Sequence, residues 1–93
     1  MDHQDLIELP NISKVLASKL KQAGINNTQE LYSVGAKEAF FRIRQFDEGA
    51  CINMLYALEG AVQGIRWHKL DGLSKFEMKE FYDFLTIQGP LKE

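Results

Sequence analysis

The 93-residue chain has a single cysteine, Cys51, so it can form no internal disulfide. It also lacks any apolar run near the ~20 residues that would span a bilayer. Its first residues do not combine a basic start with an apolar segment, as a secretory signal would. These absences predict a cytoplasmic protein with no membrane attachment.

An excess of positive charge is missing as well. Eleven basic side chains against thirteen acidic ones leave a net charge of -2, which argues against strong non-specific affinity for a polyanion. Basic residues nevertheless gather in two places, after residue 13 and around Trp67: Lys14, Lys19 and Lys21, then Arg66, His68 and Lys69. We favour a solvated helix face for the lysines, with a local nucleic-acid contact as the alternative.

Groupings typical of catalytic or metal sites are also absent. His3 and His68 have no companions at metal-ligand spacing, and Cys51 lies on an apolar helix face, where a thiol is usually inert. Helical spacing brings no second carboxylate near Glu59. We therefore expect no enzyme activity, no cofactor, no metal and no small-molecule substrate.

What the sequence does have is helical periodicity, without convincing strand alternation. It predicts one compact all-α domain over residues 1–88, a bundle of about five helices, followed by a loose tail at 89–93. Gly24 and Gly35 are the expected helix ends. The predicted helices cover about residues 13–23, 28–34, 36–45, 48–65 (opened by Asp47) and 74–88.

The fourth predicted helix is apolar on one broad face and is expected to be central. That face contains Ala50, Cys51, Met54, Leu55, Leu58, Ala61, Val62 and Ile65. A second strip of small residues would let a neighbouring helix approach closely: Asn53, Ala57, Gly60 and Gly64. Gly60 and Gly64 are therefore predicted to be structural.

The last predicted helix opens with Ser74 and Glu77 in the spacing of a capping box, in which each side chain accepts from an amide at the helix end. Leu73 and Met78 have the spacing of the accompanying hydrophobic staple. The expected buried stripe is Met78, Phe81, Tyr82, Phe84 and Leu85.

The segment from Leu9 to Leu20 has the rhythm of a helix-hairpin-helix, but Asn11 and Ser13 stand where such hairpins usually have glycines. Glycines let a phosphate approach the amides of the following helix. Asn11 or Ser13 could instead cap that helix with a side-chain oxygen. We favour a hairpin used only for packing; the alternative is a weak phosphate contact involving Asn11, Ser13, Lys14 and Lys21.

Aromatic residues suggest two further features. Trp67 is expected to fill the core at the end of the central helix, with Arg66 reaching back to Glu59; the alternative is a nucleic-acid stacking site. Three large side chains fall off the predicted core faces and would form a partner surface if exposed: Ile52, Tyr56 and Phe76.

Three segments resemble one family: LPNISKVLASKLKQAGINNTQEL (9–31), VGAKEAFFRIR (34–44) and NMLYALEGAVQGIRWHKL (53–70). Over about residues 6–86 the chain resembles the C-terminal domain of TfoX/Sxy-type competence regulators. The resemblance implies a helix-hairpin-helix-like all-α fold and a link to transcriptional control of DNA uptake. It supplies no catalytic residues.

In that family the domain follows an N-terminal domain, and this chain is expected to be a stand-alone version. The resulting hypothesis is a non-enzymatic interaction domain in transcriptional regulation. It would act mainly through contacts with a protein partner or with further copies of itself. The alternative is weak, sequence-independent binding of the DNA backbone through the hairpin at residues 11–14.

Overall fold

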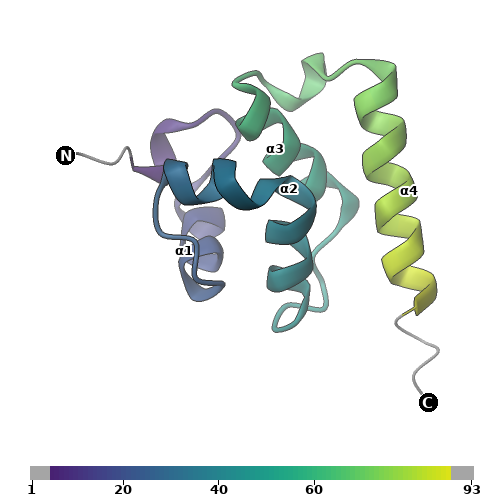
Figure 1. The fold of residues 1–93 in the computed structure, drawn as a ribbon, viewed down its shortest axis with the longest axis horizontal. Coiled ribbons are helices and arrows are strands. Elements are labelled where there is room, and N and C mark those ends of the chain that lie inside the picture. The colour runs from purple at the N-terminus through teal and green to yellow at the C-terminus, as the bar shows by residue number, and fades with distance from the viewer. Residues whose placement is uncertain (1–4, 89–93) are drawn as a thin grey trace.

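The computed structural model describes residues 5–88, which form helices and no strand (Figure 1). The elements are η1 (Leu6–Glu8), α1 (Lys14–Gln22), α2 (Thr28–Arg44), α3 (Ile52–Gln63), η2 (Trp67–Lys69) and α4 (Gly72–Gln88), where η denotes a short 3-10 helix. The all-α prediction is confirmed, but the described residues contain four α-helices rather than five. The expected tail at 89–93 lies outside the described residues.

The first two helix starts are set by local side chains. Ser13 Oγ accepts from the Leu16 amide at 3.2 Å, and Asn27 Oδ1 accepts from the Glu30 amide at 2.9 Å. The carboxylate of Glu30 in turn accepts from the Asn26 amide at 2.7 Å. These bonds satisfy end amides that have no partner within the helix.

The second and third predicted helices, on either side of Gly35, account for the difference in count. The predicted break at Gly35 is present, because its φ of 83° and ψ of 166° are not helical, and α2 bends there with no loop between its two arms (Figure 1). The two helices predicted on either side of this residue are therefore the two arms of α2.

α3 is shorter than predicted because residues before it make other bonds. Asp47 does not open the helix: it pairs with Lys19 and accepts from the Gly49 amide at 3.1 Å, which holds residues 47–51 outside the helix. Cys51 is the exposed residue before α3, so the prediction that it lies on the core face is wrong.

α4 begins two residues before the predicted start. Asp71 Oδ1 accepts from the Ser74 amide at 2.7 Å, so Asp71 performs the capping role predicted for Ser74 and Glu77. The Ser74 hydroxyl instead accepts from Gln63 Nε2 at 3.1 Å. The predicted staple and part of the buried stripe are also wrong, since Leu73 and Phe84 are exposed.

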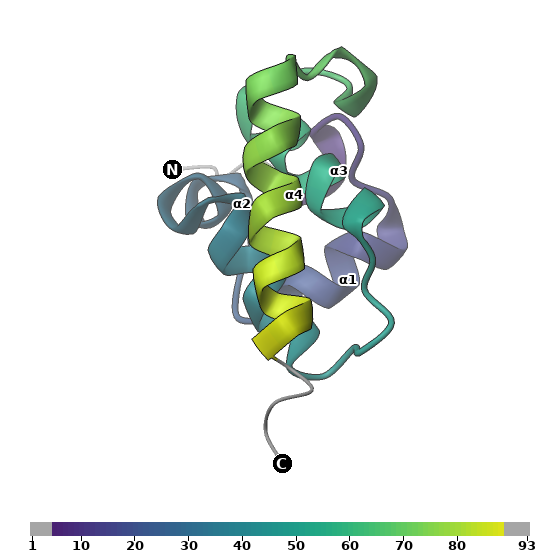
Figure 2. The same ribbon diagram turned by 90° about the vertical axis from the view of Figure 1, so that its right-hand side faces the viewer.

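α3 is the central helix, in contact with both α2 and α4. Figure 2 shows α4 running along the outside of α2 and α3. The fully buried large side chains come from η1 through α3: Leu6, Leu20, Ile25, Leu31, Phe40, Ile43, Leu55 and Leu58. α4 adds Met78, which is buried, and Tyr82, whose ring lies 6.0 Å from that of Phe40.

Candidate functional site

The turn between η1 and α1, which is the segment predicted as a hairpin and is called the hairpin below, is built around Asn11. Its φ of 71° is positive, a conformation that asparagine tolerates better than most residues. Its side-chain amide donates to the carbonyl of Ile65 at 2.9 Å and, more weakly, to that of Ala57 at 3.4 Å. Its Oδ1 accepts from the Trp67 amide at 3.1 Å. Asn11 thus joins the hairpin to the end of α3 and the turn that follows it.

Gly60 has no side chain, and this leaves room for the contact of Asn11 with Ile65 and Trp67, called the joint below. A Cβ at Gly60 would lie 2.6 Å from Asn11 Nδ2, 2.9 Å from the Ile65 oxygen and 3.1 Å from the Trp67 Cα. The close approach predicted at Gly60 is therefore present, but it is made by the hairpin and the turn rather than by a neighbouring helix.

Gly64 has a different role from the one predicted. It is the residue that ends α3, with a φ of 80°, and a Cβ there would meet nothing within 4 Å. The predicted strip of small residues along one helix face is therefore wrong at this position, and the structure uses Gly64 for its left-handed conformation.

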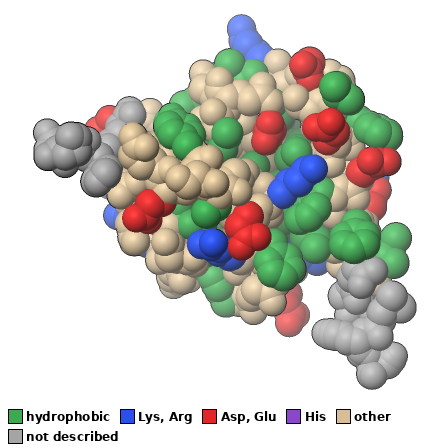
Figure 3. All heavy atoms as spheres, viewed as in Figure 1, with side chains coloured by type: hydrophobic (Ala, Val, Ile, Leu, Met, Phe, Trp, Pro, Cys, Tyr) green, Lys and Arg blue, Asp and Glu red, His purple; other side chains and the backbone are tan. Residues whose placement is uncertain are grey.

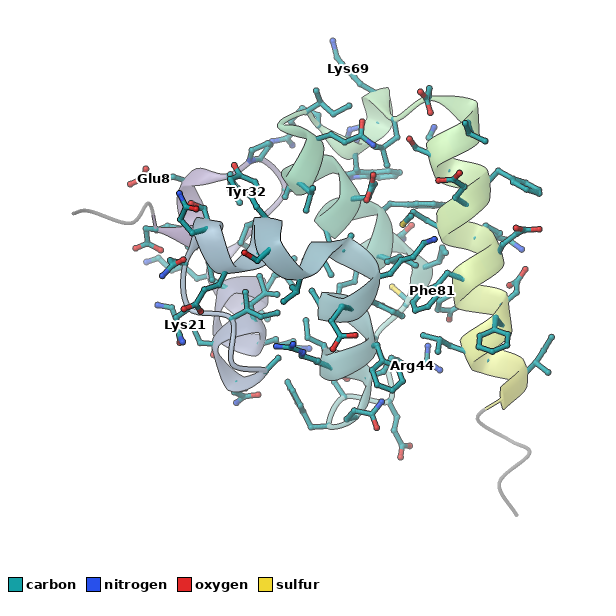
Figure 4. All side chains as sticks on the ribbon, in the orientation of Figure 1. Glu8, Lys21, Tyr32, Arg44, Lys69 and Phe81 are labelled. Carbon is teal, nitrogen blue, oxygen red and sulfur yellow. The ribbon has the colours of Figure 1, made fainter. Side chains whose placement is uncertain are left out.

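Several polar groups that a phosphate could use at the hairpin already have partners within the chain. Ser13 Oγ caps α1, and both polar groups of the Asn11 side chain are bonded to backbone. Lys14 and Lys21 are exposed and lie seven residues apart on one side of α1, with Lys21 pointing away from the body of the molecule (Figure 4). They are the cations left for an external anion on this helix.

Lys19, the third lysine of α1, is engaged. Its ammonium donates to Asp47, and this hydrogen bond is the main reason why the pKa of Asp47 is lowered from its usual value. The pair ties α1 to the loop before α3 and removes Lys19 from the basic cluster.

Trp67 is half-buried rather than a core plug, which corrects the prediction. Its ring stacks with Tyr56 at 6.0 Å and with His68 at 4.3 Å between centroids. Leu70 is the buried side chain of this turn. Glu59 accepts from Gln63 at 2.6 Å, and the ion pairs of the described residues do not include the predicted one with Arg66.

The three residues proposed as a partner surface do not form one patch. Ile52 and Tyr56 are half-buried and pack against the core cluster. Phe76 is 58% exposed and lies about 160° around α4 from the buried Met78, so it faces away from α3.

Phe76 belongs instead to an apolar surface on the outer side of α4, together with Leu73, Phe84 and Ile87, which the sequence did not predict to be exposed. Figure 3 shows hydrophobic side chains along this edge of the molecule, with carboxylates among them. The spacing of these four residues places them on one side of a helix, and this was the available signal. It was not used because Phe84 was assigned to the core face.

An open hollow of about 450 Å³ adjoins this surface. It is lined by Lys37 from α2 and by Glu77, Glu80, Phe81 and Phe84 from α4. The Lys37 ammonium lies 5.8 Å from the centre of the Phe81 ring, which points from α4 toward α2 (Figure 4).

Within residues 5–88, no three histidine, cysteine, aspartate or glutamate side chains are grouped so as to hold a metal ion. None of the helices in this range has the length and apolar character needed to cross a membrane.

Comparison with known families assigns the fold. The model of the TfoX C-terminal domain matches residues 2–82. The chain belongs to the TfoX C-terminal domain family. Protein Sxy of Escherichia coli (strain K12) is 36% identical over 81 residues, which cover 87% of this chain and 39% of Sxy. This TfoX C-terminal domain thus spans well under half the length of that relative.

Two solved structures are similar to this TfoX C-terminal domain. An uncharacterized protein from Listeria monocytogenes, in a triclinic crystal form, is 54% identical with a TM-score of 0.85, covering 91% of this chain and 94% of that one. A protein of unknown function from the same organism, in a tetragonal form, is 57% identical with a TM-score of 0.85, covering 87% and 99%.

Proposed function

We propose that this chain is a non-enzymatic interaction domain that acts in transcriptional regulation of the competence type, mainly through protein contacts. Family membership supports the regulatory role, given the resemblance to TfoX/Sxy-type competence regulators. The observation that carries the choice of protein contacts is the internal use of the hairpin. Ser13 Oγ accepts from the Leu16 amide at 3.2 Å, an amide that a phosphate-binding hairpin would leave open. The Asn11 side chain occupies the turn and bonds to the backbone of Ile65 and Trp67 at 2.9 and 3.1 Å.

The second candidate function is weak binding of the DNA backbone. It is favoured by Lys14 and Lys21, which are exposed on the same side of α1, with Lys14 in the first turn. The first-turn amides and the helix dipole favour an anion at that end. Two neutralised phosphates would give a slope of about -1.8 for the logarithm of the affinity against the logarithm of the salt concentration.

A genetic experiment separates the two functions. The gene is deleted, and transcripts of the DNA-uptake genes are measured after complementation with the wild type or with the Lys14→Glu/Lys21→Glu variant. We expect deletion to change these transcripts and both proteins to restore them, since protein contacts do not need the two lysines.

Two results would contradict this expectation. If deletion leaves the transcripts unchanged, the regulatory role is wrong. If the wild type restores regulation but the folded double variant does not, DNA binding replaces protein contact as the function. Lys37→Glu/Lys69→Glu, which makes the same change of net charge at two exposed positions outside α1, is the control.

A further inference from the structure

The outer face of α4 carries large apolar side chains that no part of the described chain covers. Leu73, Phe76, Phe84 and Ile87 are 66%, 58%, 57% and 61% exposed. At 100° per residue they fall within an arc of about 80°, opposite the side that carries Met78 and Leu85. Figure 2 looks onto this side of the molecule and shows α4 in front along its whole length. α4 is therefore apolar on two opposite sides.

The four residues are symmetrically spaced about Glu80. Phe76 and Phe84 each stand four residues from Glu80, and Leu73 and Ile87 each stand seven residues from it. Two copies of α4 packed antiparallel, with the two-fold axis at Glu80, place Phe76 opposite Phe84 and Leu73 opposite Ile87. A two-fold interface requires such self-complementarity, because the same patch serves both copies.

We propose that the outer face of α4 is a homodimer interface in which two copies of this chain pack their α4 helices antiparallel about Glu80. This proposal is independent of the regulatory role argued above. An unrelated protein partner could bind any exposed hydrophobic surface on α4. Its binding would not require the apolar residues of α4 to be spaced symmetrically about one residue. The symmetry is thus the reason to assign a second copy as the occupant.

The charged residues at the edges of this face are balanced within one chain and do not disfavour the dimer. The charge at its centre, on Glu80, does disfavour it. Asp83 is paired with Lys79 of its own helix at 2.9 Å, and this hydrogen bond raises the pKa of Lys79. Lys37 stands in the same hollow as Glu77 and Glu80 and partly balances them. The two copies of Glu80 would nevertheless meet at the axis as like charges, which weakens the pair.

The available area supports a weak dimer. Large apolar side chains exposed to this degree leave on the order of 100 Å² each, so each copy contributes about 400 Å² from the four residues. Two copies therefore bury about 800 Å² before flanking atoms are added, close to the roughly 1,000 Å² expected of a specific interface. We expect a dissociation constant between micromolar and millimolar.

Cysteine crosslinking tests the register. Cys51 is exposed and is first replaced by serine. In that background Glu80→Cys places a thiol on the two-fold axis, and mild oxidation is expected to yield a disulfide-linked dimer at micromolar protein. Ser18→Cys, an exposed position on α1, is the control for random collision and should remain largely monomeric. If Glu80→Cys crosslinks no faster than Ser18→Cys, the proposed register is wrong.

Sedimentation equilibrium tests the interface without crosslinking. The wild type should dimerise between micromolar and millimolar concentration, and Phe76→Ser/Phe84→Ser should remain monomeric. Tyr32→Ser, which changes an exposed aromatic residue on α2, should dimerise like the wild type. A wild type that stays monomeric at millimolar concentration, or a double serine variant that dimerises normally, overturns the proposal. Because all these side chains are exposed, we expect unchanged circular dichroism.

A mixing experiment tests the central contact. Glu80→Lys should self-associate as weakly as the wild type, since like charges again meet at the axis. An equimolar mixture should form a heterodimer about threefold to tenfold more tightly than either protein forms a homodimer. Equal affinities in all three cases would show that residue 80 does not face its own copy.

Discussion

The side chain of Asn11 joins parts of the chain that are 46 to 56 residues apart in sequence. Its three hydrogen bonds go to backbone groups of α3 and of the turn after it, in a partly buried place. The Ile65 carbonyl and the Trp67 amide lie after the helix, so they depend on this side chain for a partner. Its positive φ gives the hairpin its shape. The same residue therefore supplies both the turn and the joint.

Substitutions at Asn11 separate these two contributions. We expect Asn11→Ala to lower the free energy of unfolding by about 2–4 kcal/mol, because it loses the hydrogen bonds and forces alanine into positive φ. Asn11→Gly should cost about 1 kcal/mol less, since glycine accepts that φ. Urea denaturation measures both changes. Asn53→Ala, at an exposed position in α3, is the control and should be nearly neutral.

An Asn11→Gly variant as stable as the wild type would show that the hydrogen bonds of the Asn11 side chain do not stabilise the fold. In that case only the backbone conformation of the hairpin would matter, and the side chain would be free for an external ligand.

Gly60 and Gly64 should respond differently to the same substitutions. Gly60→Ala should cost about 1–3 kcal/mol, because its Cβ would lie 2.6 Å from Asn11 Nδ2 and 2.9 Å from a fixed carbonyl. Gly64→Ala should cost about 1 kcal/mol through its positive φ alone. Gly64→Asn should recover part of that loss, whereas Gly60→Asn should be worse than Gly60→Ala. Equal behaviour of the two sites in urea denaturation would contradict their separate roles.

At the scale of elements, the sequence predicted helices well where the deciding residue is local. Ser13, Asn27 and Gly35 act within a few residues of themselves, and α1 and the break in α2 lie where expected. The predicted starts of α3 and α4 were wrong because an aspartate binds a nearby backbone amide in each case. Asp47 accepts from the Gly49 amide before α3, and Asp71 accepts from the Ser74 amide at the start of α4. Asp47 is also held by Lys19, a contact across 28 residues that no local pattern indicates.

The cap of α4 gives a prediction with a pH dependence. The pKa of Asp71 is lowered, mainly by the hydrogen bond that its carboxylate accepts from the Ser74 amide. A carboxyl with a folded-state pKa below its unfolded value stabilises the fold above that unfolded value, and the stabilisation is lost as the pH falls through the folded pKa. The effect of Asp71 should therefore be full at neutral pH and decline below about pH 4.

Melting temperatures of three variants test this cap. At neutral pH, Asp71→Ala should lower the melting temperature by a few degrees and Ser74→Ala by less, since Ser74 is not the capping side chain. Asp71→Asn keeps a neutral capping side chain. Its melting temperature should therefore approach that of the wild type as the pH is lowered, because the other titrating groups are the same in both proteins and affect both equally. A larger loss in Ser74→Ala than in Asp71→Ala would restore Ser74 as the cap.

At the scale of the whole molecule, the hairpin and the outer face of α4 are separate surfaces. The hairpin question was visible in the sequence, because Asn11 and Ser13 stand in place of glycines, but the partners of Asn11 were not. The outer face of α4 was hidden for another reason: a helix with apolar residues on two sides does not indicate which side is buried. Phe84 was assigned to the core and is 57% exposed.

The hairpin is described above as a structural joint and not as a phosphate site. Fluorescence anisotropy of labelled duplex DNA, titrated with the wild-type chain over a range of salt concentrations, measures this directly. We predict weak binding at most at physiological ionic strength, unchanged by Lys14→Glu/Lys21→Glu. Tight binding that weakens with salt at a slope of about -1.8, and that is lost in the double variant, would contradict this description of the hairpin.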